Sequence, residues 1–274
     1  MTVPAASCRI TDIFPDYDQI VLLDVETTGL TTETDQIIEL AATRYYNSGA
    51  TNASGAAGAS DASDVAGFEE KKSDILVKLP KGAHLPQNII ELTNITDDML
   101  EMEGIEEAEA ANRFVDLFLP AEKTIIIAHN AQFDLSFVLK MLEKYEKRIP
   151  VSFDILDTFT VLRDRKAHPH ALKDAIEYYQ IQNAENTHRA VDDVKALSEV
   201  VKHMKEERDD VEDYINLIGV HRVHGLCGEK INGVTYCIQL LGEKRKRLPD
   251  FLKEGKRIYT PEKIQGTRPL IFKE

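Results

Sequence analysis

Asp24 and Glu26 are two residues apart in the segment IVLLDVETTGL, whose four leading apolar residues predict a buried strand. Side chains alternate along a strand, so both carboxylates emerge on one face while Val25 points into the opposite layer. Two carboxylates held on one face repel each other unless a cation lies between them. An acidic pair also occurs on solvated strand edges, but this pair stands at the mouth of an apolar strand, which favours a cation site.

A second acidic pair, Asp192 and Asp193, lies in NTHRAVDDVKALSEVV, which predicts a helix over residues 190–207 that begins close to His188. Helical spacing separates the two acids. Asp193 shares a face with apolar residues and Asp192 with charged ones: Ala196, Leu197, Val200 and Met204 for the former, and Lys195, Glu199 and Lys202 for the latter. A carboxylate on an apolar face is costly to bury without a cationic partner, so Asp193 is the candidate ligand.

Asp134 occurs in AHNAQFDLSFV, directly after an apolar strand and in the first turn of a predicted helix. A carboxylate in a first turn is also favoured by the helix dipole, which would explain Asp134 without any site. However, His129, Asn130 and Phe133 crowd the same strand end, where open α/β sheets hold their ligands. We therefore include Asp134 among the candidate site residues.

The elements that must position these residues follow from the apolar periodicity. Strands are predicted in IVLLDVETTGL, QIIELAATRYY, DILVKLP, TIIIAHN and VSFDIL, and helices over residues 105–119, 134–147, 171–179 and 190–207. Three strands come first and strands then alternate with helices, which predicts an α/β fold with a mixed sheet flanked by helices.

Composition divides the chain into unequal parts. Residues 47–67 are almost free of large apolar side chains and predict a flexible Gly/Ala/Ser loop, since they cannot bury enough surface to offset their ordering entropy. We expect an N-terminal segment at 1–18, a main domain at 19–208 and a C-terminal extension at 209–274. In that extension VHGLCGEKINGVTYCIQLLG predicts a β-hairpin, and the residues from Glu243 onward form a basic tail.

The bulk properties exclude several classes of protein. Three cysteines in 274 residues are too few for a disulfide framework, and the sequence has neither a signal-like start nor an apolar run long enough to span a membrane. We expect a cytoplasmic protein with no membrane partner. A formal charge of −14 argues against a general electrostatic clamp on nucleic acid, but an enzyme that gathers carboxylates around cations needs local negative charge.

The ordered segments DVETTG, HNAQFD and HRAVDD resemble the DEDDh exonucleases, whose members include the DnaQ-like proofreading subunits or domains of bacterial DNA polymerases. LPQNIIELTNITDDML is also similar to the family's segment between the third strand and the next helix. The resemblance spans about residues 20–208 and leaves the C-terminal tail uncovered. It implies an RNase H-like mixed sheet flanked by helices.

The resemblance also implies the roles of the five residues. Asp24 bridges two Mg²⁺ or Mn²⁺ ions, Glu26 and Asp193 complete the first site, and Asp134 holds the second ion through water. Two ions about 3.5–4 Å apart stabilise both the attacking and the leaving oxygen of an in-line displacement. His188 acts as general base toward the attacking water.

Substrate contacts are implied in the same way. Thr27, Thr28 and Leu30 resemble the family's contacts to the terminal nucleotide, with an apolar side chain against the last base. Asn130 and Phe133 are further candidate substrate contacts.

We therefore expect a 3′→5′ exonuclease that acts on single-stranded DNA 3′ ends, in polymerase proofreading or repair, with a DNA polymerase subunit as a further partner. An exoribonuclease that trims RNA 3′ ends would share every catalytic residue, because that choice depends on tolerance of a 2′-OH. An inactive module that binds a polymerase or nucleic acid is another alternative. The third alternative is a zinc site in the tail. Its spacing matches no established zinc pattern, and its candidate ligands are His221, His224, Cys227 and Cys237.

Overall fold

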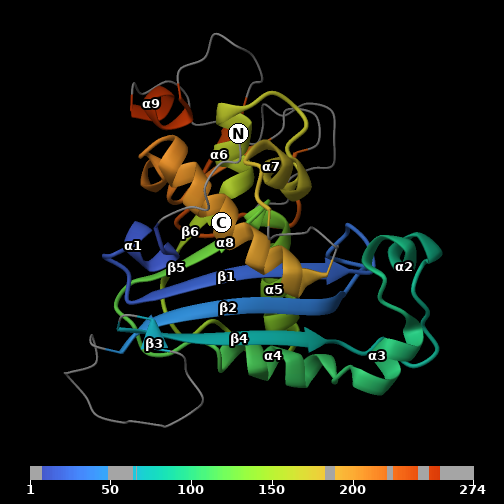
Figure 1. The fold of residues 1–274 in the computed structure, drawn as a ribbon. Coiled ribbons are helices and arrows are strands. Elements are labelled where there is room, and N and C mark those ends of the chain that lie inside the picture. The colour runs from blue at the N-terminus through green and yellow to red at the C-terminus, as the bar shows by residue number, and fades with distance from the viewer. Residues whose placement is uncertain are drawn as a thin grey trace.

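The computed structural model describes residues 8–48, 64–65, 67–182, 189–220, 225–239 and 247–253. Within these residues the main sheet has six strands in the order β3-β4-β2-β1-β5-β6 (Figure 1). Their bounds are β1 Gln19–Thr27, β2 Ile37–Asn47, β3 Asp64–Val65, β4 Phe68–Leu76, β5 Thr124–Ala128 and β6 Phe153–Asp157.

The sheet is mixed, as predicted. The first three long strands form an antiparallel meander in which β2 pairs with both β1 and β4. On its other edge β1 pairs in parallel with β5, and β5 pairs in parallel with β6. The central strand β1 is thus flanked by one antiparallel and one parallel neighbour, and it carries Asp24 and Glu26.

Helices cover both faces of this sheet. The bounds are α1 Ile10–Ile13, α2 Gln87–Thr93, α3 Asp97–Glu103, α4 Glu107–Val115, α5 Ala131–Lys144, α6 Thr158–Arg165, α7 Leu172–Tyr178, α8 Ala190–Glu207 and α9 Leu248–Lys253, with a 3₁₀ turn at Val211–Tyr214. In Figure 1, α8 crosses in front of the sheet and α4 lies behind it. Among the described residues, none of these helices is long and apolar enough to cross a membrane.

Alternate residues of β1 enter two different apolar clusters. Ile20 and Leu22 pack in the cluster that includes α8, whereas Val21, Leu23 and Val25 pack with α4 and α5 on the other face. This is the period of two expected of a strand buried on both sides. Continuing the alternation past Leu23 places the next even-numbered positions on the α8 face.

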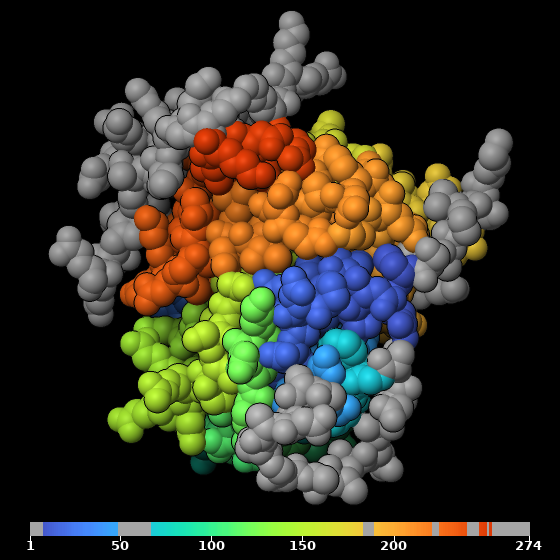
Figure 2. Space-filling view, turned by 90° about the vertical axis from the view of Figure 1, so that its left-hand side faces the viewer, coloured from blue at the N-terminus to red at the C-terminus, as the bar shows by residue number. Residues whose placement is uncertain are grey.

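The described N-terminal residues share this core. Ile10, Ile13 and Phe14 are buried in the same cluster as Val200 and Met204 of α8. Figure 2 shows the blue N-terminal segment against the orange segment that contains α8. Residues 10–14 therefore pack against α8 as part of the core between this helix and the sheet.

The predicted C-terminal hairpin is wrong. Strands β7 (Leu217–Val220) and β8 (Thr235–Ile238) do pair, but in parallel. A parallel pair cannot be joined by a two-residue turn, so Asn232-Gly233 does not connect the two strands. Instead the chain makes a longer return before β8, and part of that return packs on α5.

Two predicted segments lie partly outside the described residues. Of the predicted loop at 47–67, residues 49–63 and 66 are not described, and Asp64–Val65 pairs with β4 at the sheet edge. Of the basic tail, only residues 247–253 are described. Arg247 there forms ion pairs with Asp210, Asp213 and Asp250, so this cation is engaged within the chain.

Candidate metal centre and active site

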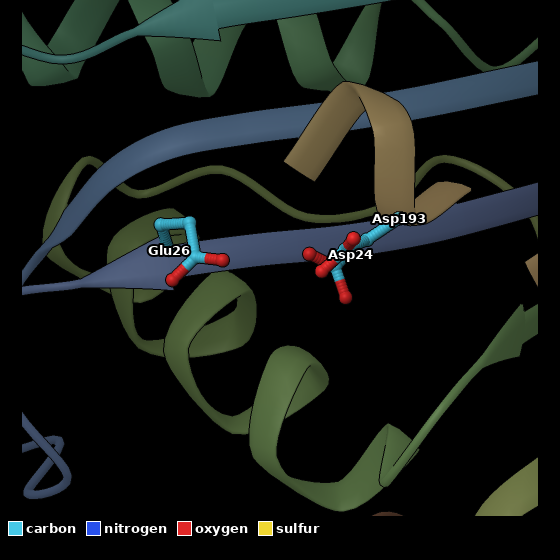
Figure 3. A group of neighbouring side chains, drawn as sticks. All are labelled: Asp24, Glu26 and Asp193. Atoms are coloured by element: carbon cyan, nitrogen blue, oxygen red, sulfur yellow. The ribbon is translucent and has the colours of Figure 1, made fainter. Parts of the chain in front are cut away.

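Three carboxylates from two elements meet at the carboxyl end of β1. Asp24 and Glu26 lie on the α8 face of β1, and Asp193 lies in the first turn of α8 (Figure 3). Each offers one carboxylate oxygen, and these oxygens all lie within 4.8 Å of one another. Among the described residues they form the one group of three or more potential metal ligands found. The register of β1 against β2 shifts between Glu26 and Thr27, and such irregularities re-aim side chains beside active sites.

Asp193 is held in place by a buried contact between α8 and β2. Glu39 of β2 is fully buried and lies opposite Glu26 across the strand pair. One of its oxygens accepts from Arg189 Nε at 2.8 Å, and the other accepts from the backbone N–H of Ala190 at 2.7 Å. The first turn of α8 is thus fixed to the sheet one helical turn before Asp193. Sequence reasoning missed Glu39, although a charged residue inside the apolar run of residues 37–42 was a usable signal.

Asp134 approaches the same strand from α5. Pairing of β5 with β1 stops at Leu22, so the edge of β1 beyond it lacks that partner strand. Asp134 Oδ1 accepts a hydrogen bond from the backbone N–H of Val25 at 3.1 Å, and its side chain is buried. The Asp134 carboxylate therefore lies at the strand end where β1 no longer pairs with β5. It contacts the backbone of Val25, the residue between Asp24 and Glu26.

Asp157, at the end of β6, positions the start of α5. Its Oδ1 accepts from the backbone N–H groups of Asn130 (2.9 Å) and Ala131 (3.1 Å), where Asn130 adopts a left-handed conformation with φ of 71°. The other oxygen accepts from Thr160 at 2.6 Å. Asp157 was not predicted either, although it follows an apolar strand just as Asp134 does.

Burial and mutual repulsion raise the pKa of these carboxyl groups. Removal from water is the largest cause for Asp24, Glu26 and Asp134, and the charges of neighbouring carboxylates add to it. The pKa of Glu26 rises to about 8, and that of Asp134 also rises to about 8. The pKa of Asp24 rises well above its ordinary value, with Asp134 and Asp193 as the largest charge contributions.

The raised pKa values indicate that the carboxylate cluster requires a compensating positive charge. At neutral pH the three raised groups ionise together only if a positive charge compensates them, because each disfavours the charged form of the others. The oxygen-only donor set suits a hard divalent cation such as Mg²⁺ or Mn²⁺. The residues present therefore fit a divalent cation of this kind.

The RNase T family, described as exonuclease, matches residues 21–201. The chain belongs to this exonuclease family. The matched region includes every carboxylate of the cluster, and the predicted resemblance to the DnaQ-like exonucleases is confirmed.

Known relatives and structures agree with this membership. The PolC-type DNA polymerase III of Clostridium perfringens is 30% identical over 197 residues, which is 70% of this chain and 12% of the polymerase. That of Staphylococcus aureus is 30% identical over 196 residues, 68% of this chain and 12% of the polymerase. The chain thus spans only about an eighth of these relatives.

Two structures of E. coli exonuclease I show the same fold. A zinc-bound complex with single-stranded DNA gives a TM-score of 0.54 at 20% identity, covering 72% of this chain and 42% of that one. A second exonuclease I structure gives 0.57 at 19% identity, covering 72% and 43%. The predicted RNase H-like sheet is confirmed.

The predicted substrate contacts differ in how accessible their side chains are. Leu30 is 79% exposed beyond the end of β1, and Asn130 is exposed at the start of α5, so both are accessible from outside. Phe133 is half-buried and packs against Phe137. The two threonine hydroxyls form hydrogen bonds within the turn: Thr27 donates to Gly29 O at 2.5 Å, and Thr28 accepts from the backbone N–H of Gln36 at 3.1 Å.

Two other predicted groups lie partly outside the described residues. His188 is in the undescribed segment 183–188, directly before Arg189. Of the alternative zinc ligands, His221 and His224 are not described. Cys237 is buried in the α8-face cluster, whereas Cys227 packs against the α5-face cluster, so nothing described joins them in one site.

Proposed function

We propose that this chain is a metal-dependent 3′→5′ exonuclease that removes nucleotides from single-stranded DNA ends. The observation that carries the proposal is the meeting of Asp24, Glu26 and Asp193 at the strand ends of an exonuclease fold. Asp134 adds a fourth buried carboxylate beside the same strand. Carboxylates gathered from three separate elements repel one another unless a positive charge compensates them, which supports cation binding at this site.

Asp24, Glu26 and Asp193 would hold one divalent cation, and Asp24 with Asp134 would hold a second. Two bound cations supply charge stabilisation to the attacking and leaving oxygens of an in-line displacement. The four carboxylates also explain how an acidic chain of net charge −14 accepts a polyanion, because the cations reverse the sign of the local field.

The chain's own residues supply binding and proton transfer. His188 accepts a proton from the attacking water as the bond between phosphorus and the 3′-oxygen of the next nucleotide breaks, since a histidine titrates near neutral pH. Leu30 and Phe133 offer apolar surface for the terminal base. The exposed Asn130 lies three residues before Phe133. The proposed substrate contacts therefore lie on the loop that follows β1 and at the start of α5.

DNA is the favoured polymer for two reasons. The curated relatives bear the name of DNA polymerases, and the similar E. coli exonuclease I structures are complexes with single-stranded DNA and with a dA16 oligonucleotide. A role beside a DNA polymerase, in proofreading or repair, follows from the first of these and is part of the proposal.

Degradation of 5′-labelled 20-nucleotide DNA, RNA, duplex and 3′-mismatched duplex with Mg²⁺ or Mn²⁺ tests the proposal. We expect a ladder that shortens from the 3′ end, faster on single strands and mismatched ends than on paired ends. Asp193→Asn serves as the control for contaminating nuclease and should give no ladder. Faster loss of RNA would assign the chain to RNA trimming, and no cleavage with either metal would leave a binding module.

A further inference from the structure

The C-terminal extension returns to the active-site helix. The segment Gly225–Ile231, here called the return segment, lies against α5 through partly buried hydrogen bonds. The Gln132 amide donates to the carbonyls of Cys227 at 2.7 Å and Glu229 at 2.9 Å, and the Ser136 hydroxyl reaches Cys227 O at 3.0 Å. Gln132 and Ser136 are both buried, where breaking such bonds leaves unpaired polar groups. The return segment is therefore firmly attached.

Tyr236 of β8 forms hydrogen bonds with both sides of this contact. Its hydroxyl donates to Gln132 Oε1 at 2.7 Å and accepts from the backbone N–H of Ile231 at 2.9 Å. Tyr236 is itself buried. Because Gln132 stands two residues before Asp134 on α5, the position of the return segment is coupled to the helix that carries a site carboxylate.

The other side of the return segment meets the loop after β1. The Cys227 thiol lies 3.8 Å from the carbonyl oxygen of Leu30, whose side chain is exposed. Cys227 and Phe133 pack against the same apolar cluster on the α5 side. Burial raises the pKa of Cys227 to about 11, and the charges of Glu33 and Asp134 add to this, which agrees with a position near the carboxylate site.

We propose that the return segment forms a wall of the binding site for the terminal nucleotide, opposite the exposed side chain of Leu30, and that it contacts the nucleobase. This inference rests on the proposed function and assigns to the C-terminal extension a part in its substrate binding. The half-buried Cys227 thiol is uncharged at neutral pH and suits the flat, weakly polar face of a base better than a phosphate. Contacts of this kind tolerate every base, so the wall contributes affinity without sequence preference.

Gly228 offers a way to displace the wall without touching a carboxylate. Its φ is +67°, and a Cβ there would collide with the hydroxyl oxygen of Ser136, so Gly228→Ala pushes the segment away from α5. Gly233→Ala is a matched control, because Gly233 has a φ of +84° but a Cβ added there would meet no heavy atom within 4 Å. Both variants carry backbone strain, and only the first adds the collision.

The experiment compares full-length wild type and both variants on single-stranded oligo-dT that ends in thymidine or in an abasic nucleotide. Loss of a contact between sulfur and the base should raise KM for the thymidine end about 2- to 10-fold in Gly228→Ala, with kcat nearly unchanged. The abasic end should show almost no difference, and Gly233→Ala should match wild type on both ends. Equal KM increases on both ends, or none on either, would overturn the inference while leaving the exonuclease activity established.

A second measurement covers the case in which Gly228→Ala fails to fold. Wild type is irradiated with an oligonucleotide that carries 4-thiothymidine at its 3′ end, with Ca²⁺, which carboxylates also bind, replacing Mg²⁺ to slow cleavage. We expect the cross-linked peptide to contain residues 225–231. Cross-links confined to other peptides would refute the wall.

Discussion

Metal-free protein should become more stable when Glu26 is replaced by glutamine. Burial and the charges of Asp193 and Glu39 raise the pKa of Glu26 from 4.5 to about 8. A carboxyl group whose pKa is higher in the folded protein than in the unfolded chain contributes its full stabilisation at any pH below the unfolded pKa. That contribution is lost as the pH rises through the folded pKa. Glutamine is neutral throughout, so Glu26→Gln removes this loss.

The magnitude follows from the same values. Between pH 4.5 and pH 8 the unfolded chain has released this proton and the folded chain has kept it, so the free energy of unfolding falls by about 1.4 kcal/mol per pH unit. The full window gives a ceiling of roughly 5 kcal/mol. Because Glu26 is only half-buried, water reduces the effect, and we expect about 2–4 kcal/mol at pH 8.

Thermal and urea unfolding in EDTA at pH 5, 6, 7 and 8 measures the difference. For a chain of this size, 2–4 kcal/mol corresponds to a rise in Tm of about 4–16 °C at pH 8, shrinking toward zero at pH 5. Glu101→Gln is the matched control, since Glu101 is 82% exposed on α3. Adding Mn²⁺ should reverse the order, because cation binding stabilises the wild type by mass action and the variant less. A metal-free variant that is less stable than wild type at pH 8 would refute the crowded-carboxylate reasoning.

Asp193→Asn should abolish most turnover while Asp192→Asn keeps a near-normal kcat, and the reverse result would show that the helical-face assignment is wrong. His188→Ala should lower kcat by roughly 10²–10⁴-fold with little change in KM and flatten the rise of rate with pH; an unchanged pH profile would remove the histidine from the mechanism. Glu39→Gln should remove the carboxylate that pairs with Arg189, destabilise the fold by about 3 kcal/mol in urea titrations and lower kcat at least about 10-fold through displacement of α8. Full activity in a destabilised variant would limit Glu39 to a structural role.

Much of the site could be predicted because it depends on local periodicity. The alternation along β1 placed Asp24 and Glu26 on one face, and the structure puts that face toward α8. Helical spacing separated Asp193 from Asp192, and α8 spans the predicted residues 190–207. Both patterns arise from backbone geometry alone, which a single sequence records directly.

Contacts between distant segments could not be predicted in this way. The pairing of Glu39 with Arg189 joins residues 150 positions apart, and no local pattern signals it. The prediction for the C-terminal strands was wrong for a related reason: Asn232-Gly233 is a strong local turn signal, but β8 pairs in parallel with β7, which lies 15 or more residues earlier in the chain. The return segment on α5 depends on Gln132 and Ser136, which appear in the sequence as ordinary helix residues.

Three buried acids share one structural task, which is to fix the backbone around the carboxylate site. Asp134 accepts from the backbone N–H of Val25, Asp157 from those of Asn130 and Ala131, and Glu39 from that of Ala190. Each bond fixes the backbone of an element that carries a candidate site residue, and the three accepting carboxylates are buried, where an unmade hydrogen bond is costly. These bonds set the spacing of the carboxylates within the protein itself, so the cation binding proposed above would not need to order them. Asp134 belongs to both sets, so it couples the rigid frame to the cluster that the frame holds.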